Sequence, residues 1–98
     1  MYHVSPIPIV PWGNEPIVEW DEENEDHVSR HGVAPWEVEE MIVQGEYECI
    51  RHPKWRRGGR YAKRYLLRGR TLGGRPLLVV VDRIGLERLR PVTVWEDR

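Results

Sequence analysis

The chain changes from helix-like to strand-like sequence at one point, near Glu46, and this change restricts its fold more than any other feature. Two segments before this point carry helix start and stop signals. After it, short apolar segments alternate with glycine-rich turns, a pattern typical of antiparallel strands. Residues 77–81 are an unbroken run of Leu and Val, which indicates a central, buried strand. The sequence therefore predicts an α+β fold, in which two N-terminal helices pack on a mainly antiparallel sheet of four to five strands.

The two helices are predicted from the residues that cap and end them. Asp21 is a typical N-cap residue, and the first helix should run to about His31 and stop at Gly32. Pro35 suits the first position of a second helix, which should end at Gly45. The second helix has an apolar stripe that should face the core: Val38, Met41 and Ile42.

The strand-like segments and the turns define the rest of the domain. Residues 1–16 contain four prolines and are expected to form an irregular Pro-rich leader, which either frays or lies along a sheet edge. Residues 17–98 are expected to form a single domain, since 98 residues suffice for one modest core. Strands are predicted over residues 17–20, 47–51, 61–70, 77–81 and 86–95, with a basic loop or hairpin tip at 52–60.

Acidic and basic residues are separated along the chain. Residues 1–50 hold twelve carboxylates and one base, Arg30, whereas residues 51–98 hold fourteen bases and four carboxylates. A small domain with this distribution can present a cationic surface to a polyanion and an acidic surface to a basic partner. The alternative is that the two halves neutralise each other in the folded chain, so charge alone does not establish a partner.

Several classes of protein and site are disfavoured. Cys49 has no cysteine to pair with, which fits a reducing cytoplasm, and a buried structural thiol is expected there. No signal peptide or long apolar span is present, so a cytoplasmic protein without membrane association is expected. His27 and His31 have a spacing that can bind zinc, but no third ligand is obvious, and neither a metal nor another cofactor is expected.

The basic segment after residue 50 has the composition of a single-stranded RNA-binding surface. Cations there would follow the phosphates, while the indole of Trp55 offers a stacking face to a base. Solvated surface charge is the alternative explanation. Arg68 and Arg90 would extend the same surface if their strands were neighbours. The predicted RNA-binding residues are therefore Arg51, Lys54, Trp55, Arg56, Arg57, Arg68 and Arg90.

Five short segments carry a family resemblance. Residues 20–21, which open a polar helix, and residues 30–33 (Arg-His-Gly-Val) resemble the (F/W)-D … K-H-G-V signature of the BrnT-like toxin family. Residues 64–70 resemble the family's E-R-(Y/W)-x-x-x-G-x strand, residues 74–81 its G-R-x-L-x-V-V strand, and residues 90–93 its R-(I/P)-(I/V)-(S/T)-A-R strand. The resemblance covers about residues 17–95, with the segments in the same order as in the family.

The resemblance implies a RelE-like α+β domain that acts as the toxin of a type II toxin–antitoxin pair. Such a toxin is an endoribonuclease that inhibits translation and is silenced by a cognate antitoxin. The sequence departs from the family pattern at Lys63, where Glu is frequent, and at Trp95, where many members carry Arg. The basic C-terminal helix usual in the family is expected to be absent or reduced.

Metal-independent RNA cleavage requires a base, an acid and a cation, and three residues are candidates. Arg64 is the first choice for the phosphate, because its planar fork suits phosphate and it falls on the family's arginine position. Its alternative role is an ion pair with a helix carboxylate. His31 and His52 are the acid–base candidates, since imidazole titrates near neutral pH. His31 could equally satisfy carbonyls at the helix terminus.

The leading prediction is thus a metal-independent endoribonuclease toxin with an RNA substrate and a cognate antitoxin protein as partners. The alternative is a catalytically inactive RNA- or protein-binding module of the same fold, which Trp95 in place of Arg would favour. A third possibility is an interaction partner that binds no RNA. The acidic helices either hold basic segments of the antitoxin or balance the charge of the fold.

Overall fold

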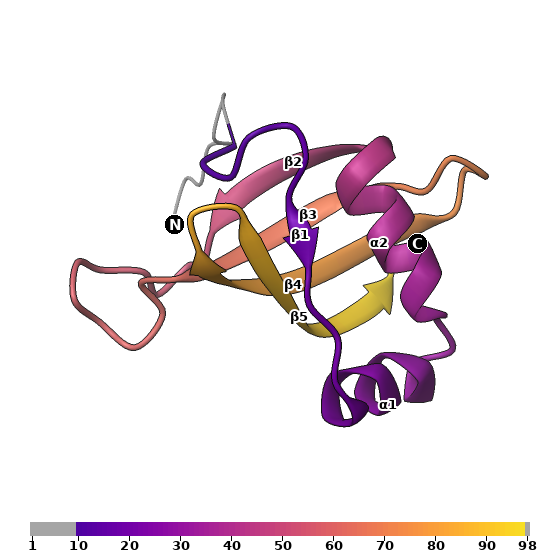
Figure 1. Cartoon of the computed structure of the whole chain (residues 1–98), viewed down its shortest axis with the longest axis horizontal. Helices are drawn as coiled ribbons and strands as arrows, with labels where there is room; N and C mark the ends of the chain where they lie inside the picture. Colours follow the sequence, from indigo (N-terminus) through magenta and orange to yellow (C-terminus); the bar gives the residue numbers. More distant parts are fainter. Residues whose placement is uncertain (1–9, 98) are drawn as a thin grey trace.

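The computed structural model describes residues 10–97, within which the chain forms two helices and five strands (Figure 1). In chain order the elements are β1 (Ile17–Val18), α1 (Glu22–Arg30), α2 (Pro35–Gln44), β2 (Glu46–Arg51), β3 (Arg64–Arg70), β4 (Pro76–Gly85) and β5 (Arg88–Glu96).

The strands form one mixed sheet in the spatial order β1-β5-β4-β3-β2. β1 runs parallel to β5, and all other neighbours are antiparallel. The predicted central strand is β4, third of the five, and its residues Leu77, Val79 and Val81 are fully buried. The α+β fold, with two N-terminal helices packed on a mainly antiparallel sheet, is confirmed.

Both helices begin and end where the capping residues predict. Asp21 accepts a hydrogen bond from the backbone N–H of Asn24 at 2.9 Å, and the Asn24 side chain accepts one from the Asp21 N–H at 2.7 Å, which closes a capping box. After α1, Gly32 has φ +75°, a left-handed conformation that glycine adopts without strain. α2 begins with Pro35 and ends before Gly45, as expected.

α1 is fixed to β5 largely by polar contacts. The buried amide of Asn24 donates hydrogen bonds to the carbonyls of Glu19 (3.1 Å) and Pro91 (3.0 Å). Near the other end of the helix, Nε2 of His27 lies 3.1 Å from Oγ1 of Thr93. α1 therefore lies along β5, and its exposed side chains border those of that strand.

Several predicted strand boundaries are wrong by a few residues. β3 begins at Arg64 and not at residue 61, because the N–H groups of Ala62 and Arg64 donate to the carbonyls three residues earlier, at 3.2 Å, in successive turns. β5 begins at Arg88, since residues 86–87 form the β4–β5 turn, and β1 covers only two of its four expected residues. The β2–β3 loop consequently spans residues 52–63 and is longer than predicted.

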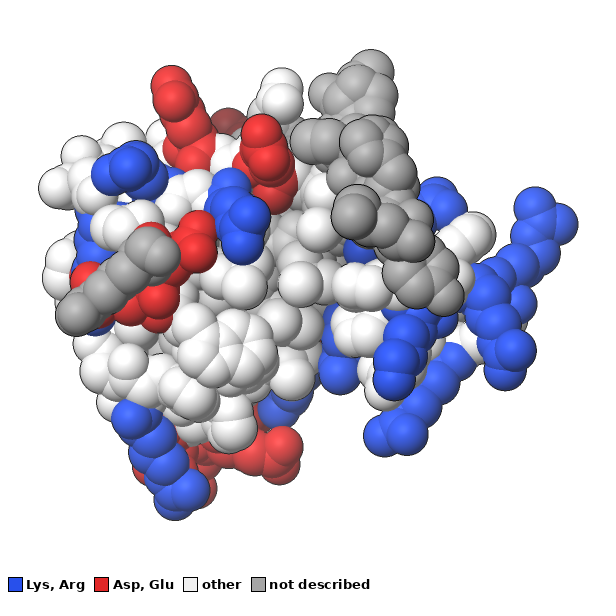
Figure 2. Space-filling model, turned by 180° about the vertical axis from the view of Figure 1, so that it is seen from behind, with Lys and Arg blue, Asp and Glu red and all other residues white. Residues whose placement is uncertain are grey.

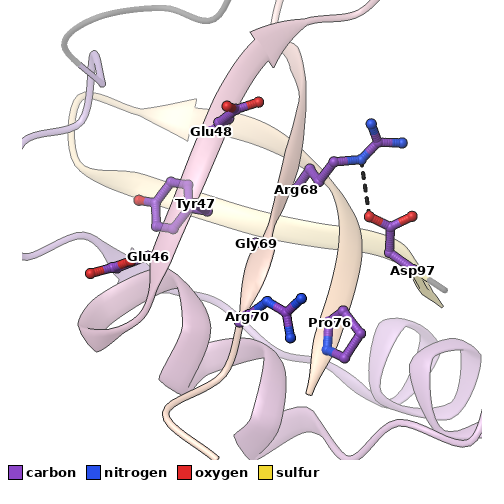
Figure 3. Close-up of a pocket in the computed structure, with 8 residues that line it drawn as sticks. All are labelled: Glu46, Tyr47, Glu48, Arg68, Gly69, Arg70, Pro76 and Asp97. Atoms are coloured by element: carbon purple, nitrogen blue, oxygen red, sulfur yellow. Dashed lines mark ion pairs between the residues drawn. The ribbon is translucent and has the colours of Figure 1, made fainter. Parts of the chain in front are cut away.

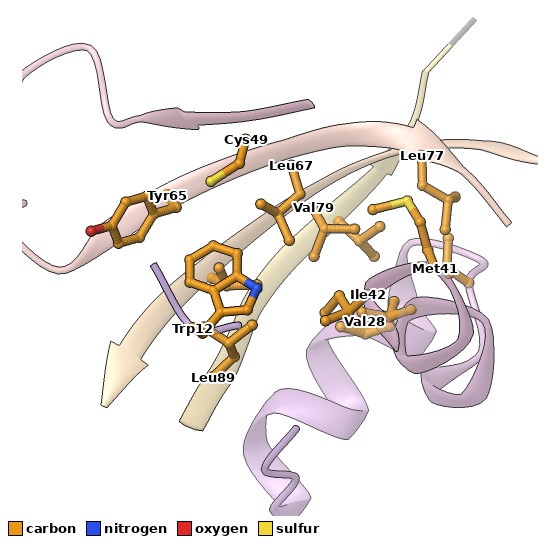
Figure 4. Packing of buried hydrophobic residues seen from close by; sticks show 14 residues of the cluster. Trp12, Val28, Met41, Ile42, Cys49, Tyr65, Leu67, Leu77, Val79 and Leu89 are labelled. Carbon is orange, nitrogen blue, oxygen red and sulfur yellow. The ribbon is translucent and has the colours of Figure 1, made fainter. Parts of the chain in front are cut away.

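The hydrophobic core lies between α2 and one face of the sheet (Figure 4). The predicted stripe of α2 is buried in it: Val38, Met41 and Ile42. Trp12, from the segment expected to be a leader, is 1% exposed, and its ring meets Tyr65 edge-on at 5.2 Å. Its Nε1 donates to the hydroxyl of Tyr47 at 3.3 Å, so this part of the segment is anchored in the core. Residues 1–9 of the expected leader lie outside the described residues.

The opposite face of the sheet, here called the open face, is not packed against α2; among residues 10–97 the only helix that contacts it is α1, which meets side chains of β5 along one border. The strand register places the side chains of this face in cross-strand rows over β3, β4 and β5. The rows are Arg64–Asp82–Arg90, Leu66–Val80–Thr93 and Arg68–Leu78–Trp95. Arginines of β3 and β5 thus share a face, but β4 separates them.

Candidate nucleic-acid interface

The loop between β2 and β3 extends from one end of the sheet (Figure 1). Together with the last residue of β2, it forms the basic loop, residues 51–63. A hydrogen bond from the His52 N–H to the Arg64 carbonyl, 3.0 Å long, closes the base of the loop. The Trp55 N–H donates to the His52 carbonyl at 2.8 Å, and Gly58 supplies a turn with φ +70°.

The cations of the basic loop are exposed. None of them forms an ion pair with another residue of the described range 10–97. In Figure 2, Lys and Arg side chains cluster at one end of the molecule without acidic neighbours, whereas acidic and basic side chains are interspersed elsewhere on that face. The six cations are Arg51, Lys54, Arg56, Arg57, Arg60 and Lys63.

Trp55, predicted to stack on a base, is held within the loop. Its Nε1 donates to the Ala62 carbonyl at 3.2 Å, and the guanidinium of Arg51 lies 4.1 Å from the ring centroid. The indole is partly buried. One face of the ring is therefore already covered by a cation, and Trp55 stiffens the loop as well as offering apolar surface.

His52 is placed at the base of the loop, stacked on Tyr61 with ring centroids 4.0 Å apart and 10° between the ring planes. The Lys54 N–H donates to its Nδ1 at 3.1 Å. Burial, followed by the positive charges of Arg64 and Lys54, lowers the pKa of His52 below its ordinary value. The imidazole is therefore neutral at neutral pH. Its hydrogen is on Nε2, so this nitrogen can donate a hydrogen bond but cannot accept a proton.

Arg64, the predicted phosphate ligand, is ion-paired in the folded chain. Its Nε and Nη2 donate to the two carboxylate oxygens of Asp82 at 2.8 and 2.9 Å. These hydrogen bonds raise the pKa of Arg64 above its usual range. The whole guanidinium fork faces a carboxylate, although 30% of the side chain is still exposed.

Arg68 and Arg90 are also ion-paired. Arg68 donates to Asp97 at 3.0 Å, and Arg90 donates to Asp21, the N-cap of α1, at 2.9 Å. A second carboxylate, Glu23, lies 3.8 Å from Arg90. These two residues therefore do not extend the unpaired charge of the basic loop.

His31 lies far from the other two predicted catalytic residues. It is the C-cap of α1, and its ring meets Trp95 edge-on at 5.9 Å. Trp95 belongs to the row of Arg68, four residues along β3 from the row of Arg64, which is about 13 Å. The structure brings His52 and Arg64 together but leaves His31 at the other end of the sheet.

A hollow of about 520 Å³ lies over β2, β3 and β4 (Figure 3). Of the predicted site residues it includes only Arg68, whose partner Asp97 faces it. Its lining mixes both signs of charge, which does not favour a polyanion. The lining residues are Glu46, Tyr47, Glu48, Arg68, Gly69, Arg70, Pro76 and Asp97.

Within residues 10–97, no three or more His, Cys, Asp or Glu side chains are arranged to hold a metal ion. Cys49 is buried, as predicted, and burial raises the pKa of its thiol to about 12. Neither helix of the described range is long and apolar enough to span a membrane.

Sequence reasoning missed the role of Asp82 and the contribution of Arg60, Tyr61 and Lys63. The observed β3–β4 register is centred on Gly73, which pairs position 64 with position 82; the two adjacent glycines of the turn place this centre only to within one residue. The charges of Arg60 and Lys63 were visible in the sequence, but Lys63 was assigned to a strand.

No family model, curated protein or solved structure matches the chain.

Proposed function

We propose that this chain binds single-stranded RNA through the basic loop and serves as the toxin of a type II toxin–antitoxin pair. The observation that carries the proposal is the group of six exposed cations that have no carboxylate partner among residues 10–97. Such cations can neutralise phosphates without first giving up an ion pair. Two aromatic rings lie at the base of the same loop, Trp55 with one face covered by Arg51 and Tyr61 with one face covered by His52, so only their remaining surface can meet an unstacked base.

Membership of the BrnT-like toxin family, with a RelE-like fold, is part of the proposal. Two helices followed by a mainly antiparallel sheet agree with the architecture that the resemblance implies. The resembling segments fall at the two ends of α1 and on β3, β4 and β5, in the expected order. On this proposal the protein acts in the cytoplasm, and a cognate antitoxin neutralises it by covering the basic loop.

Cleavage of RNA without a metal is the second part of the proposal. A base removes the 2′-hydroxyl proton, the 2′-oxygen attacks phosphorus, and the bond to the 5′-oxygen breaks as an acid protonates that oxygen. The product strand then ends in a 2′,3′-cyclic phosphate. Arg64 must exchange Asp82 for the phosphate, and His52 must move its hydrogen to Nδ1 before it can act as the base.

An inactive RNA- or protein-binding module of the same fold is the second candidate. Two observations favour it: Arg64 is ion-paired with Asp82, and His31 lies against Trp95, whose row is about 13 Å from the row of Arg64 along the strands. A module of this kind would keep the unpaired cations of the basic loop and would bind RNA without breaking it.

Expression of the full chain without a partner tests the two candidates. The toxin should arrest growth, and the purified protein should produce fragments with 2′,3′-cyclic phosphate ends in the presence of EDTA. Arg64→Ala combined with His52→Ala should relieve both effects. A harmless protein that binds RNA but leaves it intact would support the module. Absence of RNA binding at low salt would contradict the toxin and the RNA-binding form of the module.

A further inference from the structure

A groove of about 240 Å³ joins the basic loop to the β4–β5 turn. Its floor is formed where the Arg83 N–H donates to the Lys63 carbonyl at 2.8 Å, which ties the end of the loop to β4. The groove is thus continuous with the cationic surface described above. Its lining residues are Ala62, Lys63, Tyr65, Arg83, Ile84, Gly85 and Leu86.

The outer wall of the groove is apolar and exposed. Leu86 is 82% exposed, the highest value among the large apolar side chains of residues 10–97, and Ile84 is 44% exposed. The pairing of β4 with β5 shifts register between Arg83 and Gly85, and Ile84 has no partner in the ladder. A bulge of this kind redirects a side chain, here one that contributes to the groove and not to the core.

Arg83 holds this wall in place. Its guanidinium donates to the Leu86 carbonyl at 2.9 and 3.2 Å and to the Pro11 carbonyl at 3.1 Å. The turn that carries Leu86 is therefore anchored to both β4 and the segment before β1. The apolar wall is formed before any ligand arrives, which reduces the entropic cost of binding.

The charge around the groove favours an anion. Lys63 and Arg83 form no ion pair with any residue between 10 and 97, and Arg60 lies in the adjoining loop. One carboxylate, Glu87, follows Leu86 in the turn and is exposed. An apolar wall beside unpaired cations matches one nucleotide unit, whose base is flat and weakly polar on its faces and whose phosphate is negative.

We propose that this groove binds one base of the RNA strand that the basic loop holds, with Ile84 and Leu86 against the base and Lys63 on the adjacent phosphate. This inference rests on the proposed RNA binding. Leu and Ile side chains serve as wedges between bases in other nucleic-acid complexes. The volume is below the usual 300–1,000 Å³ of drug-sized pockets, so a single base fits better than a larger ligand.

The test compares two exposed turns. The double variant Ile84→Ala/Leu86→Ala should weaken binding of a fluorescent decaribonucleotide about tenfold, the size of one base-stacking contact, without changing the salt dependence. Leu72→Ala is the matched control: this leucine is 62% exposed in the β3–β4 turn and should have no effect. Circular dichroism and the Tm of each variant verify that it is folded.

Lys63→Ala separates the phosphate contact from the base contact, because it should reduce the salt slope by about 0.7. Unchanged affinity of the Ile84/Leu86 variant, with RNA still bound by the wild type, would overturn the groove and leave the proposed function standing. Absence of wild-type RNA binding would overturn both. Binding of phosphatidylserine vesicles in place of RNA, lost in the double variant, would assign the groove to a membrane surface and also overturn the inference.

Discussion

Three arginines of the sheet and the cations of the basic loop have the same charge but different surroundings. On the sheet, Arg64, Arg68 and Arg90 each face a carboxylate within 3.0 Å. In the basic loop, six cations have no such partner among residues 10–97. The availability of a C-terminal base to a polyanion therefore depends on its surroundings in the fold. It cannot be read from the number of bases in the sequence.

Strand register, the position of α1 and the projection of the β2–β3 loop explain the difference. β3 and β4 are joined by a tight turn, which places Asp82 directly opposite Arg64. α1 lies along β5 and delivers Asp21 to Arg90. The basic loop instead projects beyond the sheet, away from both acidic helices (Figure 1). Charge neutralisation, the alternative to a partner, therefore accounts for Arg64, Arg68 and Arg90 of the sheet but not for the loop.

Removal of unpaired cations should have the largest effect on RNA binding. The triple variant Lys54→Ala/Arg56→Ala/Arg57→Ala should bind a decaribonucleotide about a hundredfold more weakly at 0.1 M salt, since each lost phosphate contact contributes about 0.7 of a decade. Fluorescence anisotropy measures the affinity.

The control for this variant removes three exposed but paired arginines: Arg30→Ala/Arg68→Ala/Arg88→Ala. Their side chains are 74%, 64% and 54% exposed, and each contacts a carboxylate. The net charge changes by the same amount, so an equal loss of affinity would show that pairing is irrelevant.

Arg75 represents the opposite case, a paired arginine with a structural role. It donates to Glu37 at 2.7 Å and to the Gly32 carbonyl at 2.9 Å, and its side chain is 28% exposed. Arg75→Ala should lower the free energy of unfolding by about 1 kcal/mol, with unchanged RNA affinity. Urea denaturation measures the first quantity; a loss of RNA binding without a loss of stability would contradict the assignment.

Release of a paired arginine should strengthen binding. Asp82→Asn keeps the shape of the partner but removes its charge, so Arg64 becomes available to a phosphate. RNA affinity at 0.1 M salt should rise by about fivefold, the contribution of one phosphate contact. If affinity is unchanged, the RNA does not reach the open face at Arg64.

The smallest effect concerns the protonation of His52. Because its pKa is lowered in the folded chain, its imidazole should titrate below the ordinary value of 6.5, which NMR of the ring protons can follow. The lowered pKa also means that the stability contributed by neutral His52 is present above pH 6.5 and is lost as the pH falls through the folded-state pKa. A midpoint at or above 6.5 would contradict the described environment.

The sequence predicted the elements that depend on local signals. Asp21, Gly32 and Pro35 act within one turn of the chain, and the helices that they delimit are found as expected. Contacts between distant segments were not predicted. Burial of Trp12 against Tyr65 depends on where the N-terminal segment crosses the core, which no local pattern specifies.

The candidate site likewise has features that the sequence predicted and features that it did not. The basic loop could be predicted from its local content of Lys, Arg and Gly, so Lys54, Arg56 and Arg57 were correctly expected to be exposed cations. Whether an arginine is paired depends on sheet register and helix placement. For that reason the sequence alone could not separate Arg90 from Arg57, or place His31 relative to Arg64.

The salt dependence of RNA binding tests the central claim most directly. If the six unpaired cations of the basic loop hold the strand, a plot of log affinity against log salt should have a slope of about −4 for the wild type and for the paired-arginine control, and about −2 for the triple loop variant. Equal slopes for the wild type and the loop variant, or the same reduction in the control, would contradict it.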